Sequence, residues 1–293
     1  MIKLLLFLLL ISAKSFGALK VVTTTTNLQS IVKEIGKELV DVTSITKGVQ
    51  DPHFIEAKPT FIRRLVDADL LISIGAGLEQ GWLPLLISGS RKSHFLNGAS
   101  RHLVVSDRLN LIDKVGPEHL TRASGDVHPE GNPHFLISPS YSISVAKNIT
   151  EKLKNLSSDN AQYFEKNFLL YKSKVQEIIK SIQKNTPKDF KVITYHKTLS
   201  YYFNEFGIES VNVLEPKPGV PPTASHILQV IKDIQKHNVK LILVENYYDL
   251  NIARRIKEKL PMVEVKSIPV AVHGNKDISD IYLFYELLGK EIR

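Results

Sequence analysis

The chain has 293 residues and a formal net charge of +8, from 38 Lys and Arg against 30 Asp and Glu. The basic residues are spread singly and in pairs, without a block or an aromatic-basic face, which argues against a nucleic-acid-binding protein. Because the sequence has no cysteine, we expect neither a disulfide framework nor a lipid-modified cysteine.

Residues 1–17 are typical of a cleavable secretory signal peptide. Lys3 gives a basic start, and the apolar run from Leu4 to Ile11 is too short to span a membrane. The small residues Ser15 and Gly17 lie where a signal peptidase requires them, so cleavage is expected after Gly17. No other segment reaches spanning length, and we therefore expect a soluble protein of the periplasm without a lipid anchor.

In the first half of the chain, apolar runs of strand length alternate with amphipathic stretches, a pattern that predicts a mainly parallel sheet flanked by helices. A helix is expected at about 59–68, where Phe61, Leu65 and Ala68 share a face. The expected strands are 19–23, 40–45, 70–74 and 103–106.

The middle of the chain differs from both halves. Residues 160–183 contain neither Gly nor Pro, and their apolar positions recur every three or four residues, which is helical spacing. Such a helix would be on the order of 36 Å long, enough to run along a two-lobed molecule. An ordinary long surface helix is the alternative. The expected division is an N-terminal lobe at 18–158, a linking helix at 159–185 and a C-terminal lobe at 186–293.

The second half repeats the α/β pattern of the first. Helices are expected at about 224–237 and 250–260, and strands at 191–195, 210–214, 241–244 and 263–268. The predicted fold class is therefore α/β, with two lobes that each have a mainly parallel β-sheet flanked by helices, joined by one long rigid helix.

Three histidines stand out among the ten in the sequence: His53, His134 and His196. Each follows an apolar run that resembles a strand, so three loops can bring three neutral imidazoles together. The first two follow prolines, which restrict the backbone and hold the next side chain in a rigid turn. Three convergent imidazoles indicate a transition-metal site, most plausibly for zinc. A lone histidine is more often a surface or core residue.

A polar segment at 113–133 contains two further histidines, His119 and His128. Loops of this length without regular structure are usually functional or disordered. This loop could sample metal ions weakly and pass them to a deeper site, or it could be a mobile surface loop with incidental histidines.

Several short motifs, in this order and spacing, resemble the substrate-binding proteins of bacterial zinc or manganese ABC transporters of the type with a rigid linking helix. The resemblance covers nearly the whole chain after residue 17. The matching pieces are Val21-Val22-Thr23-Thr24, Asp51-Pro52-His53 with Glu56 and Pro59, the run from Ala68 to Glu79 before Trp82, Gly131-Asn132-Pro133-His134 with Pro139, then His196, Glu215-Pro216-Lys217-Pro218-Gly219 and Pro222-Thr223.

This resemblance implies a receptor, not an enzyme, that binds a divalent metal at His53, His134 and His196 in the cleft between the lobes. It also implies a membrane permease and an ATPase as partners, and a monomeric protein. Manganese-type members carry a carboxylate where His196 stands here, so the third imidazole favours Zn²⁺, with Mn²⁺ as the alternative cargo.

The fourth ligand departs from the family pattern. Many relatives have an aspartate after the last strand, but residues 266–275 contain no carboxylate. We prefer Glu245, because it follows the apolar run 241–244 at the carboxyl end of an expected strand, where ligands gather in parallel sheets. His273, Asp277 and water are the other candidates.

Two further functions remain open at this point: a periplasmic zinc-dependent hydrolase, and an adhesin or binder of an organic ligand with incidental histidines. The first is disfavoured because the sequence lacks His-Glu-x-x-His and Gly-x-Ser-x-Gly motifs. If imidazoles bind the metal, its affinity should fall steeply below about pH 6, because protonated imidazoles do not coordinate.

Overall fold

The computed structural model describes residues 17–116, 128–216 and 219–292. Residues 1–16, which carry almost the whole expected signal peptide, lie outside this part of the chain, as does His119. Within the described ranges, no helix combines the length and the apolar character that a membrane span needs.

The N-terminal lobe is built on a four-stranded parallel sheet, in which β1 lies at the centre between β2 and β3. Its apolar, mostly buried strands fit a sheet covered by helices on both faces. The strands are β1 (Leu19–Thr23), β2 (Val40–Ser44), β3 (Leu70–Ser73) and β4 (His102–Val104), in the order β2-β1-β3-β4.

Helices α1 (Thr26–Gly36), α2 (Pro59–Val66) and α3 (Leu83–Ser90) connect these strands and cover the two faces of the sheet. The hydroxyl of Thr25 caps α1 by accepting from the Leu28 amide. Helix α2 begins with a proline, whose fixed φ suits the first turn. Each loop that leaves the carboxyl end of β1, β2 or β3 therefore leads into one of these helices.

The C-terminal lobe repeats this architecture with a second four-stranded parallel sheet, in the order β6-β5-β7-β8. Together, the two sheets confirm the predicted fold class. The strands are β5 (Lys191–Thr194), β6 (Glu209–Val213), β7 (Leu241–Glu245) and β8 (Glu264–Ile268), and the helices are α6 (Ser200–Phe206), α7 (Ala224–His237) and α8 (Asn251–Lys259).

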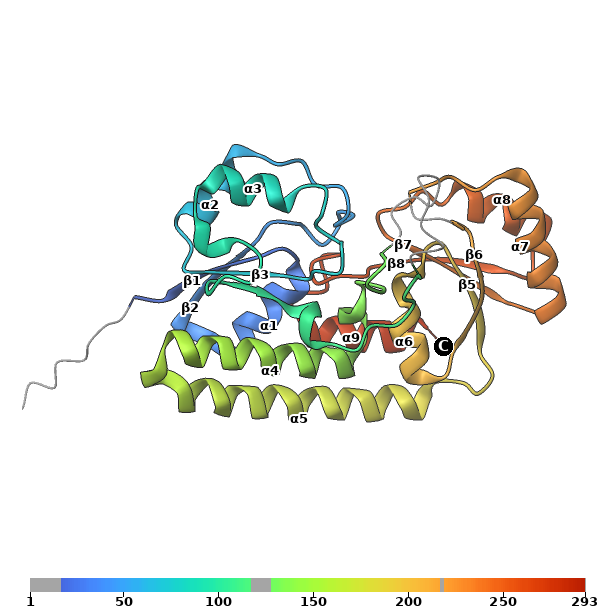
Figure 1. Cartoon of the computed structure of the whole chain (residues 1–293). Helices are drawn as coiled ribbons and strands as arrows, with labels where there is room; N and C mark the ends of the chain where they lie inside the picture. Colours follow the sequence, from blue (N-terminus) through green and yellow to red (C-terminus); the bar gives the residue numbers. More distant parts are fainter. Residues whose placement is uncertain (1–16, 117–127, 217–218, 293) are drawn as a thin grey trace, which may run out of the picture.

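Two long helices lie side by side along the molecule, α4 (Pro139–Leu156) and α5 (Ala161–Asn185). Figure 1 shows α5 running beneath both lobes, from the first sheet to α6. Its buried residues recur at the helical spacing expected from the sequence and include Phe164, Phe168 and Val175. This helix agrees with the expected linker, whereas the exact boundaries of the three segments stay a prediction.

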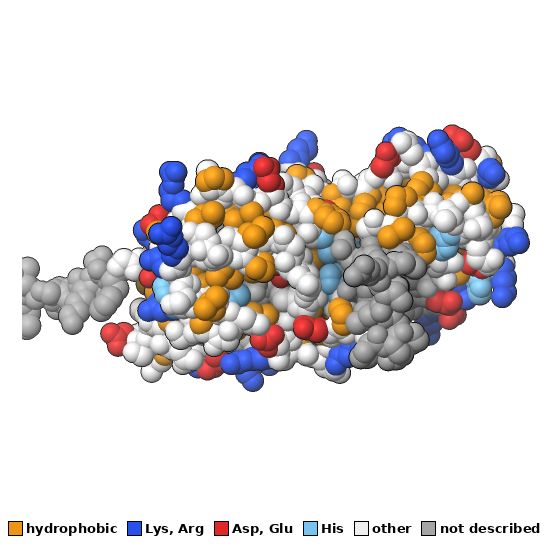
Figure 2. Space-filling model, turned by 45° about the horizontal axis from the view of Figure 1, so that its top comes forward, with side chains coloured by type: hydrophobic (Ala, Val, Ile, Leu, Met, Phe, Trp, Pro, Cys, Tyr) orange, Lys and Arg blue, Asp and Glu red, His pale blue; other side chains and the backbone are white. Residues whose placement is uncertain are grey.

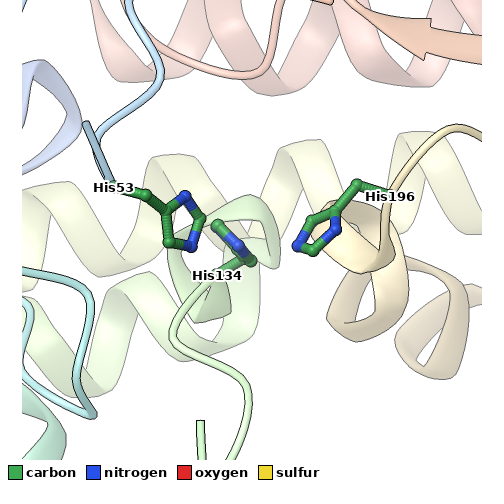
Figure 3. Close-up of side chains that lie close together, drawn as sticks. All are labelled: His53, His134 and His196. Atoms are coloured by element: carbon green, nitrogen blue, oxygen red, sulfur yellow. The ribbon is translucent and has the colours of Figure 1, made fainter. Parts of the chain in front are cut away.

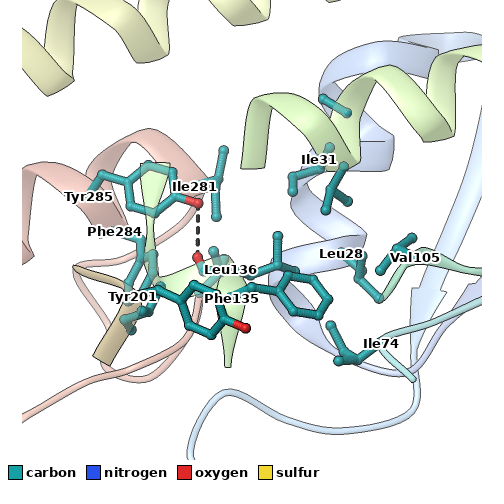
Figure 4. Close-up of a cluster of buried hydrophobic side chains, with 14 of the residues drawn as sticks. Leu28, Ile31, Ile74, Val105, Phe135, Leu136, Tyr201, Ile281, Phe284 and Tyr285 are labelled. Atoms are coloured by element: carbon teal, nitrogen blue, oxygen red, sulfur yellow. Dashed lines mark hydrogen bonds between the residues drawn. The ribbon is translucent and has the colours of Figure 1, made fainter. Parts of the chain in front are cut away.

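The last helix, α9 (Ile281–Glu291), returns from β8 to pack against α1 and α5. The Ile281 amide donates to Ser30 Oγ at 2.9 Å, and the Tyr285 hydroxyl donates to the Leu136 carbonyl at 2.9 Å. Figure 4 shows Ile281, Phe284 and Tyr285 in one apolar cluster with Leu28 and Ile31 of α1. The end of the chain therefore completes the core beneath the first sheet.

Candidate metal centre

Three histidines from three separate loops meet between the lobes. One ring nitrogen of each of His53, His134 and His196 lies within 4.8 Å of the other two. The ring centroids are 5.1 Å apart for His53 and His134, 5.4 Å for His134 and His196, and 6.0 Å for His53 and His196. Figure 3 shows the three rings turned toward one another. The structure thus brings together the three histidines expected from the sequence.

The loop that follows β2 holds His53 in a tight turn. One carboxylate oxygen of Asp51 accepts from the His53 amide at 3.0 Å and lies 2.6 Å from His53 Nδ1. The Trp82 indole donates to the Pro52 carbonyl at 2.9 Å and anchors the turn to the N-terminal lobe. A proton on Nδ1, donated to the carboxylate, would leave Nε2 of His53 unprotonated and able to bind a cation.

A second carboxylate orients His196, which directly follows β5. Glu215, two residues past β6, places Oε2 2.8 Å from His196 Nδ1, and its Oε1 accepts from the Gly219 amide at 3.0 Å. Both side chains are buried. The sequence pattern includes Glu215 only as part of a motif, and its role beside the histidine is visible only in the structure.

His134 is part-buried, whereas His196 is 4% exposed, but the ring nitrogen Nε2 of His134 is enclosed. Its backbone amide donates to Asn132 Oδ1 at 2.9 Å, so the Asn-Pro-His turn mirrors the Asp-Pro-His turn of His53. Nε2 of His134 is buried and has no hydrogen-bond partner in the part of the chain that the structure describes. Burial holds the pKa of His134 well below its usual range, and neighbouring histidines add to the effect. His134 is therefore a neutral imidazole at pH 7.

A fourth histidine, His128, joins this group. Its Nε2 lies 3.1 Å from Nε2 of His53, and the two rings stack with centroids 5.2 Å apart. Burial, followed by the charges of His53 and His196, lowers the pKa of His128 to about 4. Gly77, with φ of +82°, leaves room for the ring, because a Cβ there would lie 3.1 Å from His128 Nδ1. Nothing in the sequence around His128 distinguishes it from an incidental loop histidine.

Glu245, expected as a fourth ligand, is not in the group of mutually close donor atoms. It ends β7 and is 1% exposed, and neither carboxyl oxygen has a hydrogen-bond partner among the described residues. Burial raises the pKa of Glu245 to about 8, so the side chain is mainly protonated at pH 7. His273 and Asp277, the other candidates, are exposed and also lie outside the group.

The donor set suits a borderline transition metal. Neutral imidazoles coordinate zinc without first losing a proton. The carboxylates of Asp51 and Glu215, which lie beside the Nδ1 atoms of His53 and His196, would offset the positive charge of the ion. Figure 2 shows histidine side chains at the surface where the two lobes meet, with hydrophobic side chains on both sides. Within the site, His53 and His134 are part-exposed.

Comparison with known proteins adds three findings. The family profile described as "Zinc-uptake complex component A periplasmic" matches residues 21–283. The sequence is 28% identical over 258 residues to the high-affinity zinc uptake system protein ZnuA of Bacillus subtilis (strain 168), covering 85% of this chain and 78% of that protein. It is 25% identical over 244 residues to the manganese ABC transporter substrate-binding lipoprotein PsaA of Streptococcus mitis, covering 81% and 75%.

Among solved structures, the fold matches that of the SBP FpvC from Pseudomonas aeruginosa in complex with Mn²⁺, with a TM-score of 0.75 and 22% identity. The match covers 94% of this chain and 96% of that one. Since some relatives are named lipoproteins, the names conflict with the expectation of a protein without a lipid anchor, which stays a prediction.

Proposed function

Because this chain belongs to the family of periplasmic component A of zinc-uptake complexes, we propose that it captures Zn²⁺ between its lobes and delivers it to an ABC permease. The observation that carries this proposal is the convergence of His53, His134 and His196 from loops of both lobes. The family is one of substrate-binding components, and its match gives no support to the hydrolase alternative.

The choice of zinc over manganese rests on the donor atoms. Relatives are named for zinc and for manganese, so the family alone does not select the ion. Imidazole nitrogen suits Zn²⁺, whereas Mn²⁺ prefers carboxylate and other oxygen donors. The donor atoms that lie close together here are nitrogens of three histidines. The carboxylates of Asp51 and Glu215 contact the Nδ1 atoms of His53 and His196.

We propose His128 as the fourth ligand. Two nitrogens of a tetrahedral zinc site, each about 2.05 Å from the ion, are about 3.3 Å apart. The Nε2 atoms of His53 and His128 are 3.1 Å apart, close to that separation. Glu245, by contrast, would have to leave an enclosed position and lose a proton before it could coordinate.

The remaining assignments follow from the proposed role. The protein would act in the periplasm after removal of residues 1–17, as a monomer, with a membrane permease and a cytoplasmic ATPase as partners. The segment at 113–133, of which residues 117–127 lie outside the described structure, would sample metal and pass it to His53, His134 and His196.

The test is a titration of the metal-stripped protein with Zn²⁺ and with Mn²⁺, for the wild type and for His196→Ala. We expect one tight zinc per chain, much weaker manganese binding, and a large loss of zinc affinity in the variant. His273→Asn is the matched control, because this histidine is exposed at φ of +61°, where asparagine is tolerated. Absence of stoichiometric zinc, or manganese binding of equal strength, would contradict the proposal.

A further inference from the structure

We propose that Asn132 is a positioning residue that fixes His134 and His196 relative to each other across the two lobes. The inference rests on the proposed function, since it treats both histidines as zinc ligands. Asn132 is 6% exposed and lies two residues before His134. No ring nitrogen contacts it directly, so any effect on the metal must act through the two histidine loops.

The side chain of Asn132 bridges the two loops. Oδ1 accepts from the His134 amide at 2.9 Å, which closes the turn that presents that ring. Nδ2 donates to the carbonyl of Lys197 at 2.9 Å, next to His196. One amide group therefore holds the backbones beside both proposed ligands.

The remaining hydrogen-bonding groups of Asn132 are also satisfied. Nδ2 donates its second hydrogen to Asp113 Oδ2 at 3.1 Å, and the backbone amide donates to the Ile112 carbonyl at 2.8 Å. The backbone carbonyl accepts from the Tyr201 hydroxyl at 2.7 Å, and that hydroxyl accepts from the Ile112 amide at 3.1 Å. Because Asn132 is buried and its hydrogen-bonding groups are all paired, any other side-chain conformation would leave a buried polar group unpaired.

Only an amide of this length supplies both bonds at once. Serine can still offer an oxygen to the His134 amide in the equivalent turn, but it has no donor that reaches Lys197. Asn132→Ser therefore keeps the local turn and removes both Nδ2 bonds, the bridge to Lys197 and the bond to Asp113, without adding a charge. Alanine at this position removes both.

Tyr201 provides an independent way to loosen the same bridge, because Tyr201→Phe removes one hydroxyl and keeps the ring. Tyr141→Phe is the matched control. Its ring lies 4.7 Å from that of Tyr201, and its hydroxyl also donates to a backbone carbonyl, that of Asn110, which is not part of the bridge.

The experiment measures the zinc dissociation constant, the visible absorption of the Co²⁺-substituted protein and the melting temperature of the metal-free protein. We expect Asn132→Ser to weaken zinc binding by roughly 10–100-fold and to change the Co²⁺ bands, as residues that orient ligands do. Tyr201→Phe should act in the same direction by a smaller factor, and Tyr141→Phe should match the wild type.

A double-mutant cycle with His196→Ala separates positioning from general stability. If Asn132 acts through the His134 and His196 pair, Asn132→Ser should cost little further affinity once His196 is absent. An equal loss in both backgrounds would overturn the inference, as would a lowered melting temperature with unchanged affinity and unchanged Co²⁺ bands. Failure of the wild type to bind zinc would overturn the proposed function as well, whereas tight wild-type binding with unaffected variants would overturn this inference alone.

Discussion

Nε2 of His53 lies 3.1 Å from Nε2 of His128, although 75 residues separate the two in sequence. At this distance, one ring nitrogen can donate an N–H to the other. A zinc ion bound by both rings would replace that hydrogen bond with a nitrogen–nitrogen separation of about 3.3 Å. The separation of the two rings therefore already resembles the one that coordination requires.

Replacing His128 with alanine should weaken zinc binding by at least tenfold, because it removes the fourth imidazole and leaves a water in its place. The matched comparison is Glu245→Gln, which should leave the zinc dissociation constant unchanged. Calorimetric titration of the metal-stripped proteins checks both. The reverse result, with Glu245→Gln weakened and His128→Ala intact, would restore Glu245 as the fourth ligand.

The carboxylates behind the rings give a second prediction. Asp51→Asn and Glu215→Gln should each lower zinc affinity by roughly 10–100-fold, because each replaces the charged acceptor that orients a ligand ring with a weaker, neutral one. Glu56→Gln is the control, since Glu56 lies in the His53 loop with its side chain 81% exposed. Competition with a chelator of known affinity measures the three variants, and equal affinities throughout would contradict the predicted role.

The lowered pKa values of two rings make the predicted pH dependence of zinc binding less steep than four ordinary imidazoles would give. Burial, together with neighbouring histidines, holds the pKa of His134 well below its usual range and lowers that of His128 to about 4. His128 is therefore mainly neutral at pH 5 to 6.5, so metal displaces almost no proton from it, and His134 holds a proton less readily than an ordinary imidazole. Of four imidazole ligands, at most three can then contribute, so log Kd should change by no more than three units per pH unit. A steeper slope in that range would contradict the assignment.

The burial of Glu245 predicts that the stability of the metal-free protein depends on pH. Burial raises its pKa to about 8, above the usual value of 4.5, so the folded state retains a proton that the unfolded state releases. The resulting stability is complete below about pH 4.5 and is lost as the pH rises toward 8. Between pH 5 and 8 the wild type should lose on the order of 3 kcal/mol of its free energy of unfolding through this group.

Glu245→Gln should not show this loss, because an amide does not titrate. Urea unfolding at pH 5, 6.5 and 8 tests the difference, with Glu258→Gln on the exposed face of α8 as the control. A constant difference between Glu245→Gln and the wild type across these pH values would show that the carboxyl group does not titrate as its burial implies.

Most of the fold can be predicted from the sequence, because its elements have simple periodic patterns. The eight expected strands match β1 to β8 to within two residues at either end, and α7 has the expected bounds. The expected elements do not include α1, α3, α4 and α6. Helix α1 nevertheless has apolar residues at helical spacing, Leu28, Ile31 and Ile35, so its signal is present in the sequence.

The site is less predictable than the fold. Rigid turns set by proline mark His53 and His134, and a strand end marks His196, so local sequence is informative for all three. The partners of these residues are long-range contacts: His128 meets His53, and Glu215 meets His196, only once the chain has folded. The same holds for Asn132, whose bond to Lys197 joins residues 65 positions apart.

Helix α9 has a consequence for when the protein can fold. Phe284, Tyr285 and Leu288 belong to the same apolar core as Leu28 and Ile31, near the other end of the chain. A ribosome must therefore synthesise almost the whole polypeptide before the first lobe can reach its final packing. Such a chain emerges from the ribosome without a completed native domain.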